Sequence, residues 1–141
     1  MVIKVRQLLL RLGLTAAFLI LFAGILILSK RQPQKNEILL ETESEREAWL
    51  NLRGWRVGEP EISEAVMPSA WTTLNGQRWL SLQQEQGLSP EQYAGKNITR
   101  YLYPIENGET PELYAELYLC GDALCGAQSY YAETGIMRTV R

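Results

Sequence analysis

The chain contains no histidine and only two cysteines among its 141 residues. Histidine is the commonest general base in enzymes and the commonest protein ligand of transition metals. A cysteine nucleophile would also have no histidine to activate it. We therefore predict no catalytic residue, no metal site and no cofactor, and we expect that the protein is not an enzyme.

Acidic residues are absent from the first 35 positions, where six lysine and arginine residues give a net charge of +6. The remaining eight bases and all 16 acids follow, so residues 36–141 carry a net charge of −8. An acidic domain is repelled by nucleic acid and by anionic lipid, because both carry negative phosphates. We therefore predict no nucleic acid partner and a separate role for the basic N-terminal part.

The longest uncharged run covers residues 12–28, "LGLTAAFLILFAGILIL". As a helix it would be roughly 25 Å long, and the flanking Arg11, Lys30 and Arg31 can extend to the two membrane interfaces. Neither a small-residue cleavage site nor a cysteine follows the run, which favours an uncleaved signal-anchor over a signal peptide or a lipoprotein. The sequence therefore predicts a transmembrane helix that binds the protein to the lipid bilayer.

The orientation in the membrane is only weakly indicated by charge, because three bases precede the apolar run and three follow it. A short tail ahead of a signal-anchor most often stays in the cytoplasm. We therefore predict a cytoplasmic tail over residues 1–11, a stalk over residues 29–41 and a domain over residues 42–141 outside the cytoplasm. The expected location is the cell membrane, with a single pass.

The domain shows the patterns of an α+β fold. Thr42 or Ser44 can begin a helix that ends before Gly54, and Ser69 can begin a second helix of about four turns. A turn at Gly121-Asp122 would join two strands of a hairpin. Further strands are expected over residues 61–68, residues 97–103 and the C-terminal end. We predict two helices that cover one face of a mainly antiparallel sheet of about four to five strands.

Three glutamates at the start of the first helix, Glu43, Glu45 and Glu47, are candidates for acid–base chemistry. A solvated helix start explains them better, because carboxylates match the positive N-terminal end of a helix. The cysteines Cys120 and Cys125 are predicted to share a face of the hairpin in diagonal positions, with Cys125 opposite Tyr118. A slip to a four-residue turn would place the two cysteines opposite each other, so a disulfide is permitted but not required.

The stretch Leu82–Ile105 is rich in glutamine, glycine and tyrosine. Most of these residues are predicted to end or begin structural elements, which leaves five candidates for binding: Tyr93, Lys96, Arg100, Tyr101 and Tyr103. Tyr114, Tyr118 and Tyr130 on neighbouring strands can add to the same aromatic face. Two interpretations stay open, namely cross-strand packing of the rings and a tyrosine-lined recognition surface edged by Arg100 and Lys96.

The pattern from Glu45 to the C-terminus resembles a bacterial domain of unknown function, DUF family 4830. The matching residues are Arg46, Trp49, Leu50, Gly54, Trp55, Val57, Pro68, Asn75, Gln83, Gln86, Gly87, Tyr93, Gly95, Arg100, Tyr101 and Tyr103, followed by the hairpin around Gly121 and the "GIM" at residues 135–137. The chain departs from the family pattern at Leu88 and at Cys125-Gly126. The resemblance implies a fold and an N-terminal membrane segment, but no activity, substrate or catalytic residue.

Taken together, these patterns predict a membrane-anchored, extracytoplasmic binding or protein-interaction module of unknown ligand, with an envelope protein as one kind of partner. The alternatives are a small extracytoplasmic enzyme that uses carboxylates or Cys125, and a structural component of the cell envelope. Geometry separates these classes. A concave pocket with converging Glu, Tyr and Arg side chains favours a ligand site or an enzyme, whereas a convex surface favours a protein partner.

Overall fold

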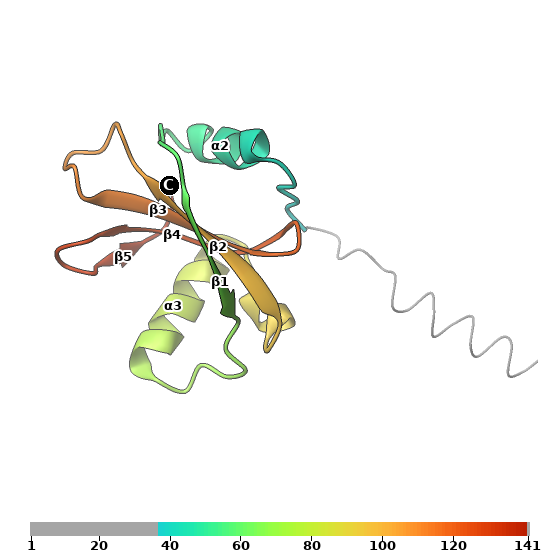
Figure 1. Ribbon diagram of the computed structural model, residues 1–141. Helices are drawn as coiled ribbons and strands as arrows, with labels where there is room; N and C mark the ends of the chain where they lie inside the picture. The colour runs from blue at the N-terminus through green and yellow to red at the C-terminus, as the bar shows by residue number, and fades with distance from the viewer. Residues whose placement is uncertain (1–36, 141) are drawn as a thin grey trace, which may run out of the picture. The chain divides into compact units, whose positions relative to one another are not determined.

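The computed structural model describes residues 37–140, which form an α+β fold (Figure 1). Its five strands make one antiparallel sheet in the order β1-β2-β3-β4-β5. The sequence predicted a mainly antiparallel sheet of about four to five strands, without their order. The elements in chain order are α2 (Glu43–Asn51), β1 (Glu61–Val66), α3 (Leu74–Glu85), the short 3₁₀ helix η1 (Pro90–Tyr93), β2 (Asn97–Pro104), β3 (Leu113–Cys120), β4 (Ala123–Tyr131) and β5 (Met137–Arg138).

The predicted cytoplasmic tail and transmembrane helix lie outside the described residues, as does most of the predicted stalk. From residue 37 to residue 140, no helix has both the length and the apolar character that a membrane crossing requires. The end of the predicted stalk, however, belongs to the domain. Leu39 forms a β-bridge with Ala123, and Leu40 is 4% exposed in the core. The boundary at residue 42 was wrong, because the apolar Ile38-Leu39-Leu40 segment adds to the edge of β4.

Helix α2 begins and ends where local sequence signals place it. Thr42 Oγ1 accepts a hydrogen bond from the backbone N–H of Glu45, and the Glu45 carboxylate accepts one from the N–H of Thr42. This reciprocal capping satisfies two donors that the first helical turn leaves free. Gly54 follows the helix with a φ of 87°, a conformation that favours glycine. Trp49 and Leu50 are buried against the sheet.

Helix α3 is shorter than predicted. It begins at Leu74 rather than after Ser69, because Thr73 is the capping residue and its Oγ1 accepts a hydrogen bond of 3.1 Å from the N–H of Gly76. This cap also explains the glycine at position 76, in the first turn of the helix. A Cβ at that position would lie 3.0 Å from Thr73 Oγ1.

The two helices lie on opposite sides of the sheet, as Figure 1 shows. On one face Tyr101 of β2 pairs with Leu117 of β3, and both pack in the cluster that contains Trp49 and Leu50 of α2. On the other face, the ring of Tyr118 lies edge-on to Trp79 of α3, with the ring centres 5.6 Å apart. The prediction that both helices cover one face is therefore wrong. The face of β3 toward α3 carries tyrosine rings, which are partly apolar, so it is also buried by a helix.

The β3–β4 hairpin has the predicted two-residue turn, in which Cys120 pairs with Ala123 and Gly121 has a φ of 61°. The register shifts after Tyr118, so that Tyr118 pairs with Gly126 rather than with Cys125. Cys125 is therefore the extra residue of a β-bulge, and its predicted position opposite Tyr118 is wrong. Turn residues do not encode a bulge, which adds one residue to one strand only.

Two glutamines of the stretch Leu82–Ile105 join α3 to the outer edge of β4. The N–H of Ala127 donates to Gln83 Oε1 at 2.8 Å, and Gln86 Nε2 donates to the carbonyl of Ala127 at 2.8 Å. Gln86 Oε1 also accepts a hydrogen bond from the N–H of Val140 at 2.9 Å. These side chains satisfy backbone groups of β4 that no neighbouring strand pairs. The two glutamines thus have a structural role, in agreement with the interpretation that most residues of this stretch begin or end structural elements.

A methyl group at Gly126 is expected to lower the free energy of unfolding by about 1–2 kcal/mol. The Cβ of Gly126→Ala would lie 3.0 Å from Trp79 Cζ2 and 3.2 Å from Tyr118 Cδ2. Urea unfolding of the full chain in detergent, followed by tryptophan fluorescence, measures this cost. In a Trp79→Leu background the same change should cost much less, because a leucine leaves space there. An equal cost in both backgrounds would show that α3 does not pack on β4 in this way.

Candidate functional site

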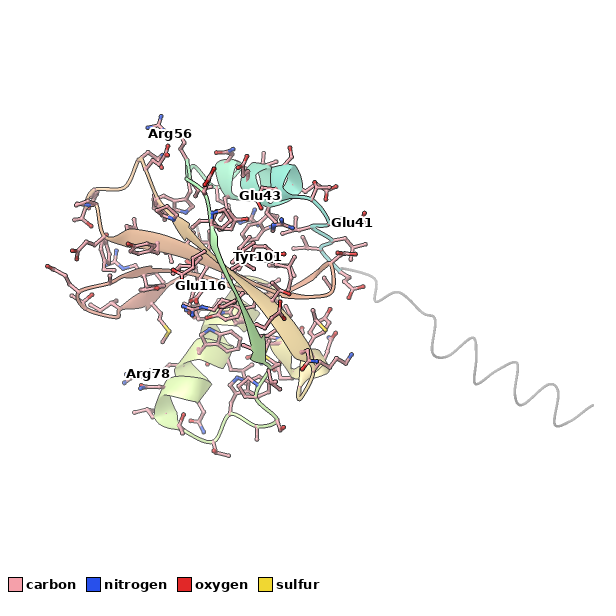
Figure 2. The ribbon with its side chains drawn as sticks, in the orientation of Figure 1. Glu41, Glu43, Arg56, Arg78, Tyr101 and Glu116 are labelled. Carbon is pink, nitrogen blue, oxygen red and sulfur yellow. The ribbon has the colours of Figure 1, made fainter. Side chains whose placement is uncertain are left out.

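A cleft of about 480 Å³ opens on the face of the sheet that is turned toward α3. Three strands supply its polar residues, with Arg100 on β2, Glu116 on β3 and Gln128 on β4. Glu116 and Gln128 are direct cross-strand partners. Figure 2 shows Glu116 between the sheet and α3. The complete lining is Arg100, Glu116, Tyr118, Gln128, Tyr130, Gly135 and Met137.

Glu116 is the centre of the polar network, although its side chain is only 2% exposed. Its Oε1 accepts a hydrogen bond from Arg100 Nε in an ion pair, and its Oε2 accepts one from Gln128 Nε2 at 2.5 Å. A buried carboxylate is costly unless charge and hydrogen bonds compensate it. Both oxygens are compensated here, so Glu116 holds its two neighbours in place.

Gln128 is the third polar residue of this network. The residue is 6% exposed, and its Nε2 also donates to Tyr118 Oη at 3.2 Å. Its Oε1 is buried and has no hydrogen-bond partner among the described residues. Buried acceptors are nearly always paired in folded proteins. A ligand with an N–H or O–H group would supply the missing donor.

Two tyrosines complete the cleft. Burial raises the pKa of Tyr118 to about 12, so its hydroxyl stays protonated at neutral pH and can donate a hydrogen bond. The ring of Tyr130 stacks on Tyr114, with ring centres 5.9 Å apart and planes inclined by 25°. Within residues 37–140, the Tyr130 hydroxyl makes no hydrogen bond and the terminal nitrogens of Arg100 have no partner. The cleft thus combines donors, one acceptor and an aromatic ring.

Of the predicted site residues, the structure brings only Arg100 into this cleft. Tyr101 and Tyr103 lie on the opposite face, where their rings are 6.5 Å apart. Tyr103 is fully buried, and its hydroxyl accepts from Arg46 Nε at 3.2 Å and donates to Glu43 at 3.0 Å. The guanidinium of Arg46 lies 4.2 Å from the centre of the Tyr101 ring. These contacts favour the packing interpretation for both tyrosines. Tyr114, Tyr118 and Tyr130 therefore do not extend their aromatic face.

Tyr93 and Lys96 form a separate contact near the first described residue. Lys96 Nζ lies 5.3 Å from the centre of the Tyr93 ring, and the Tyr93 hydroxyl donates to Glu37 at 2.6 Å. Burial and this glutamate raise the pKa of Tyr93. The five predicted binding residues therefore do not form one surface.

The two cysteines are free thiols in this structure. Cys125 is fully buried, and its thiol donates to the carbonyl of Tyr118 at 3.0 Å. Burial, together with the neighbouring Cys120, raises the pKa of Cys125 to about 12. Since the thiolate is the nucleophile, such a thiol reacts slowly at neutral pH.

A second cavity, of about 250 Å³, is lined mainly by apolar side chains and by Tyr118, which also lines the cleft. The rings of Trp71 and Trp79 are nearly parallel there, with an interplanar angle of 6° and centres 6.4 Å apart. The indole N–H of Trp71 is buried without a partner in the described part of the chain. Because this cavity lacks converging polar groups, the cleft beside Gln128 is the stronger candidate for a ligand site.

Sequence reasoning missed Glu116, Gln128 and Tyr130 as partners of Arg100. Alternation along Leu113–Cys120 did place Glu116 between Tyr114 and Tyr118 on one face. A carboxylate flanked by two tyrosines on a strand was the available signal, but only the tyrosines were interpreted as part of a candidate surface. The pairing of β3 with both β2 and β4 turns these scattered residues into a cluster.

Comparisons of the chain with protein-family models, with curated proteins and with solved structures find no match to it. The class that the fold and the cleft define is a small α+β domain with a polar cleft on one face of its sheet. The resemblance to DUF family 4830 stays a prediction.

Proposed function

We propose that the protein is a membrane-anchored module whose domain lies outside the cytoplasm and binds a small polar ligand in the cleft beside Gln128. The observation that supports binding is the buried Gln128 Oε1, which has no partner within residues 37–140 and belongs to a residue that lines the cleft. Arg100, Glu116 and two tyrosines converge on the same cleft. Polar groups that converge beside an aromatic ring are the kind of arrangement that favours a ligand site.

Binding fits this geometry better than catalysis. A general base needs a free basic oxygen within reach of the substrate proton. Both oxygens of Glu116 already accept hydrogen bonds, and Cys125 lies outside the lining of the cleft with its pKa raised to about 12. The cleft therefore resembles a recognition site with fixed polar groups rather than an acid–base or nucleophilic centre.

A protein partner is the second candidate, and strand β1 is the observation that favours it. All six of its residues are exposed, among them Ile62 at 58% and Val66 at 61%, and it is an edge strand of the described sheet. Such an edge can add a strand from an envelope protein. Glu61 and Glu64 place two negative charges on this short strand, which disfavours pairing with another strand. We therefore favour the cleft as the main site.

The anchor is proposed from the sequence alone, because residues 12–28 form a long uncharged run that is flanked by bases. We expect the full-length chain to stay in the membrane fraction after a carbonate wash. In a Cys120→Ala, Cys125→Ala background, Gln34→Cys should react with a membrane-impermeant thiol reagent on whole cells. Labelling only after lysis would place the domain in the cytoplasm, and a mature form that begins near Ser29 would show a cleaved signal peptide.

The binding function is tested with a mixture of small polar molecules that includes sugars, amino acids, carboxylates and amides. Saturation-transfer NMR on the full chain should detect at least one binder whose signal is lost in the Gln128→Met variant. The variant should keep its near-UV circular dichroism, which shows that it is folded. If no member of the mixture binds in a way that depends on Gln128, the cleft is not a ligand site for this chemistry and the proposal fails.

A further inference from the structure

The charges of the cleft cancel. Among the described residues that line it, Arg100 and Glu116 are the only ionised side chains, and they form an ion pair with each other. An anionic ligand that approached the guanidinium of Arg100 would also approach the carboxylate of Glu116. A cationic ligand that approached the carboxylate of Glu116 would also approach the guanidinium of Arg100. The cleft therefore offers no net counter-charge, and a neutral ligand avoids the desolvation cost of a second ion.

The hydrogen-bonding groups of the cleft require a ligand that both donates and accepts. Gln128 Oε1 needs a donor. The terminal nitrogens of Arg100 and the hydroxyl of Tyr118 supply donors, and the Tyr130 hydroxyl can do either. These donors and acceptors fit a small molecule whose neighbouring atoms carry groups that can each donate and accept a hydrogen bond. Adjacent hydroxyls on a ring have this property.

The Tyr130 ring supplies an apolar surface beside these polar groups. It is half-buried and is supported from below by its stacking on Tyr114. A saccharide ring has one face of C–H groups and a rim of hydroxyls, so it can pack on an aromatic ring while its rim makes hydrogen bonds. A cleft of about 480 Å³ is in the size range of small-molecule sites.

The geometry points to a neutral saccharide as the ligand of this cleft, an inference that rests on the proposed binding function. Its C–H face packs on Tyr130. One hydroxyl donates to Gln128 Oε1, and neighbouring hydroxyl oxygens accept from Arg100 and Tyr118. Glu116 does not contact the sugar in this arrangement but fixes Arg100 and Gln128 for it.

The test uses the full chain in a detergent without a sugar headgroup, so that the detergent itself cannot occupy the cleft. The probes are glucose, galactose, N-acetylglucosamine and the disaccharides lactose and cellobiose. Glucuronate serves as the anionic comparison, and N-acetylalanine methylamide as the neutral peptide comparison. Titration by NMR should show saturable binding of at least one neutral saccharide with a Kd of about 1 mM or tighter, and weaker binding of glucuronate.

Variants locate the binding. Gln128→Met and Tyr130→Leu should each weaken saccharide binding about tenfold or more, because one removes the acceptor and the other removes the ring. Tyr130→Phe keeps the ring and should weaken binding less. Gln92→Met changes an exposed glutamine of η1 and serves as the matched control, with no expected change. Tyr130 is not part of the core, so its variants keep the test valid if Gln128→Met fails to fold.

The outcomes separate this inference from the proposed function. Binding of glucuronate or of the peptide amide that depends on Gln128, without binding of any neutral saccharide, would overturn the saccharide class and leave a ligand site. Saccharide binding that is unchanged in Gln128→Met and Tyr130→Leu would place it elsewhere and overturn the inference. If neither these probes nor the broader mixture binds, both the inference and the proposed function fail.

Discussion

Replacing Arg46 by methionine is expected to lower the free energy of unfolding by about 3 kcal/mol, one of the largest effects of any single change in the domain. Arg46 is 8% exposed on α2. Its guanidinium donates to the carbonyls of Leu40 and Glu41 at 3.2 and 3.3 Å, and to the Glu43 carboxylate at 2.8 Å. Methionine fills similar space but leaves these acceptors without their donor, and the Leu40 bond is buried.

The same change also removes contacts to the sheet. Arg46 Nε donates to Tyr103 Oη, and the guanidinium lies over the ring of Tyr101. Arg46 thus joins the first described residues, α2 and β2 in one network. This explains why the two tyrosines of β2 behave as packing residues rather than as a recognition surface.

Arg53, which follows the C-terminal end of α2, provides a matched control. Its guanidinium lies 3.4 Å from the centre of the Trp49 ring and donates to the carbonyl of Trp49 at 2.9 Å. Arg53 is half-exposed, so water can replace these contacts, and Arg53→Met should cost no more than about 1 kcal/mol.

Urea unfolding of the full chain in detergent, followed by tryptophan fluorescence, compares the stabilities of the Arg46→Met and Arg53→Met variants. All four tryptophans lie within residues 37–140, so this signal reports the domain. If both variants lower the free energy of unfolding by the same small amount, Arg46 does not connect α2 to β2 and to the first described residues in this way.

Local signals in the sequence predicted much of the fold. The start of α2 at Thr42 or Ser44, its end at Gly54 and the Gly121-Asp122 turn each depend on residues within a few positions of one another. Such signals can be recognised in a sequence because the partners of each hydrogen bond are close in the chain. The start of α3 is the exception, because Ser69 and Thr73 both have the chemistry of a cap and the helix begins after Thr73.

Contacts between distant residues could not be predicted in the same way. Arg46 and Tyr103 are 57 positions apart, and Gln83 and Ala127 are 44 apart. The side of the sheet that each helix covers follows from such pairs, and so does the grouping of Arg100 with Glu116 and Gln128. The bulge at Cys125 shifts the hairpin by one residue, which no turn signal announces. The site was therefore visible in the sequence only as one arginine and a set of tyrosines.

The ion pair in the cleft is expected to show strong coupling in a double-mutant cycle. Glu116→Leu should lower the free energy of unfolding by about 3 kcal/mol, because it leaves Arg100 without its counter-ion and Gln128 Nε2 without its acceptor. Arg100→Met should cost about 2–3 kcal/mol, because the carboxylate of Glu116 then stays buried without a cation. Arg100→Met with Glu116→Leu removes both charges together. That double variant should cost at least about 2 kcal/mol less than the sum of the two single costs.

Stability and binding should then separate in the double variant. The apolar pair restores much of the stability, because a buried ion pair can be replaced by apolar side chains at little cost. Binding should not recover, because Arg100 no longer donates to the ligand and Gln128 loses the carboxylate that orients its amide. Urea unfolding and saccharide titration on the same preparation measure both quantities. Additive stability costs would show that Arg100 and Glu116 do not interact in solution. Recovery of binding would show that this polar network does not position the ligand.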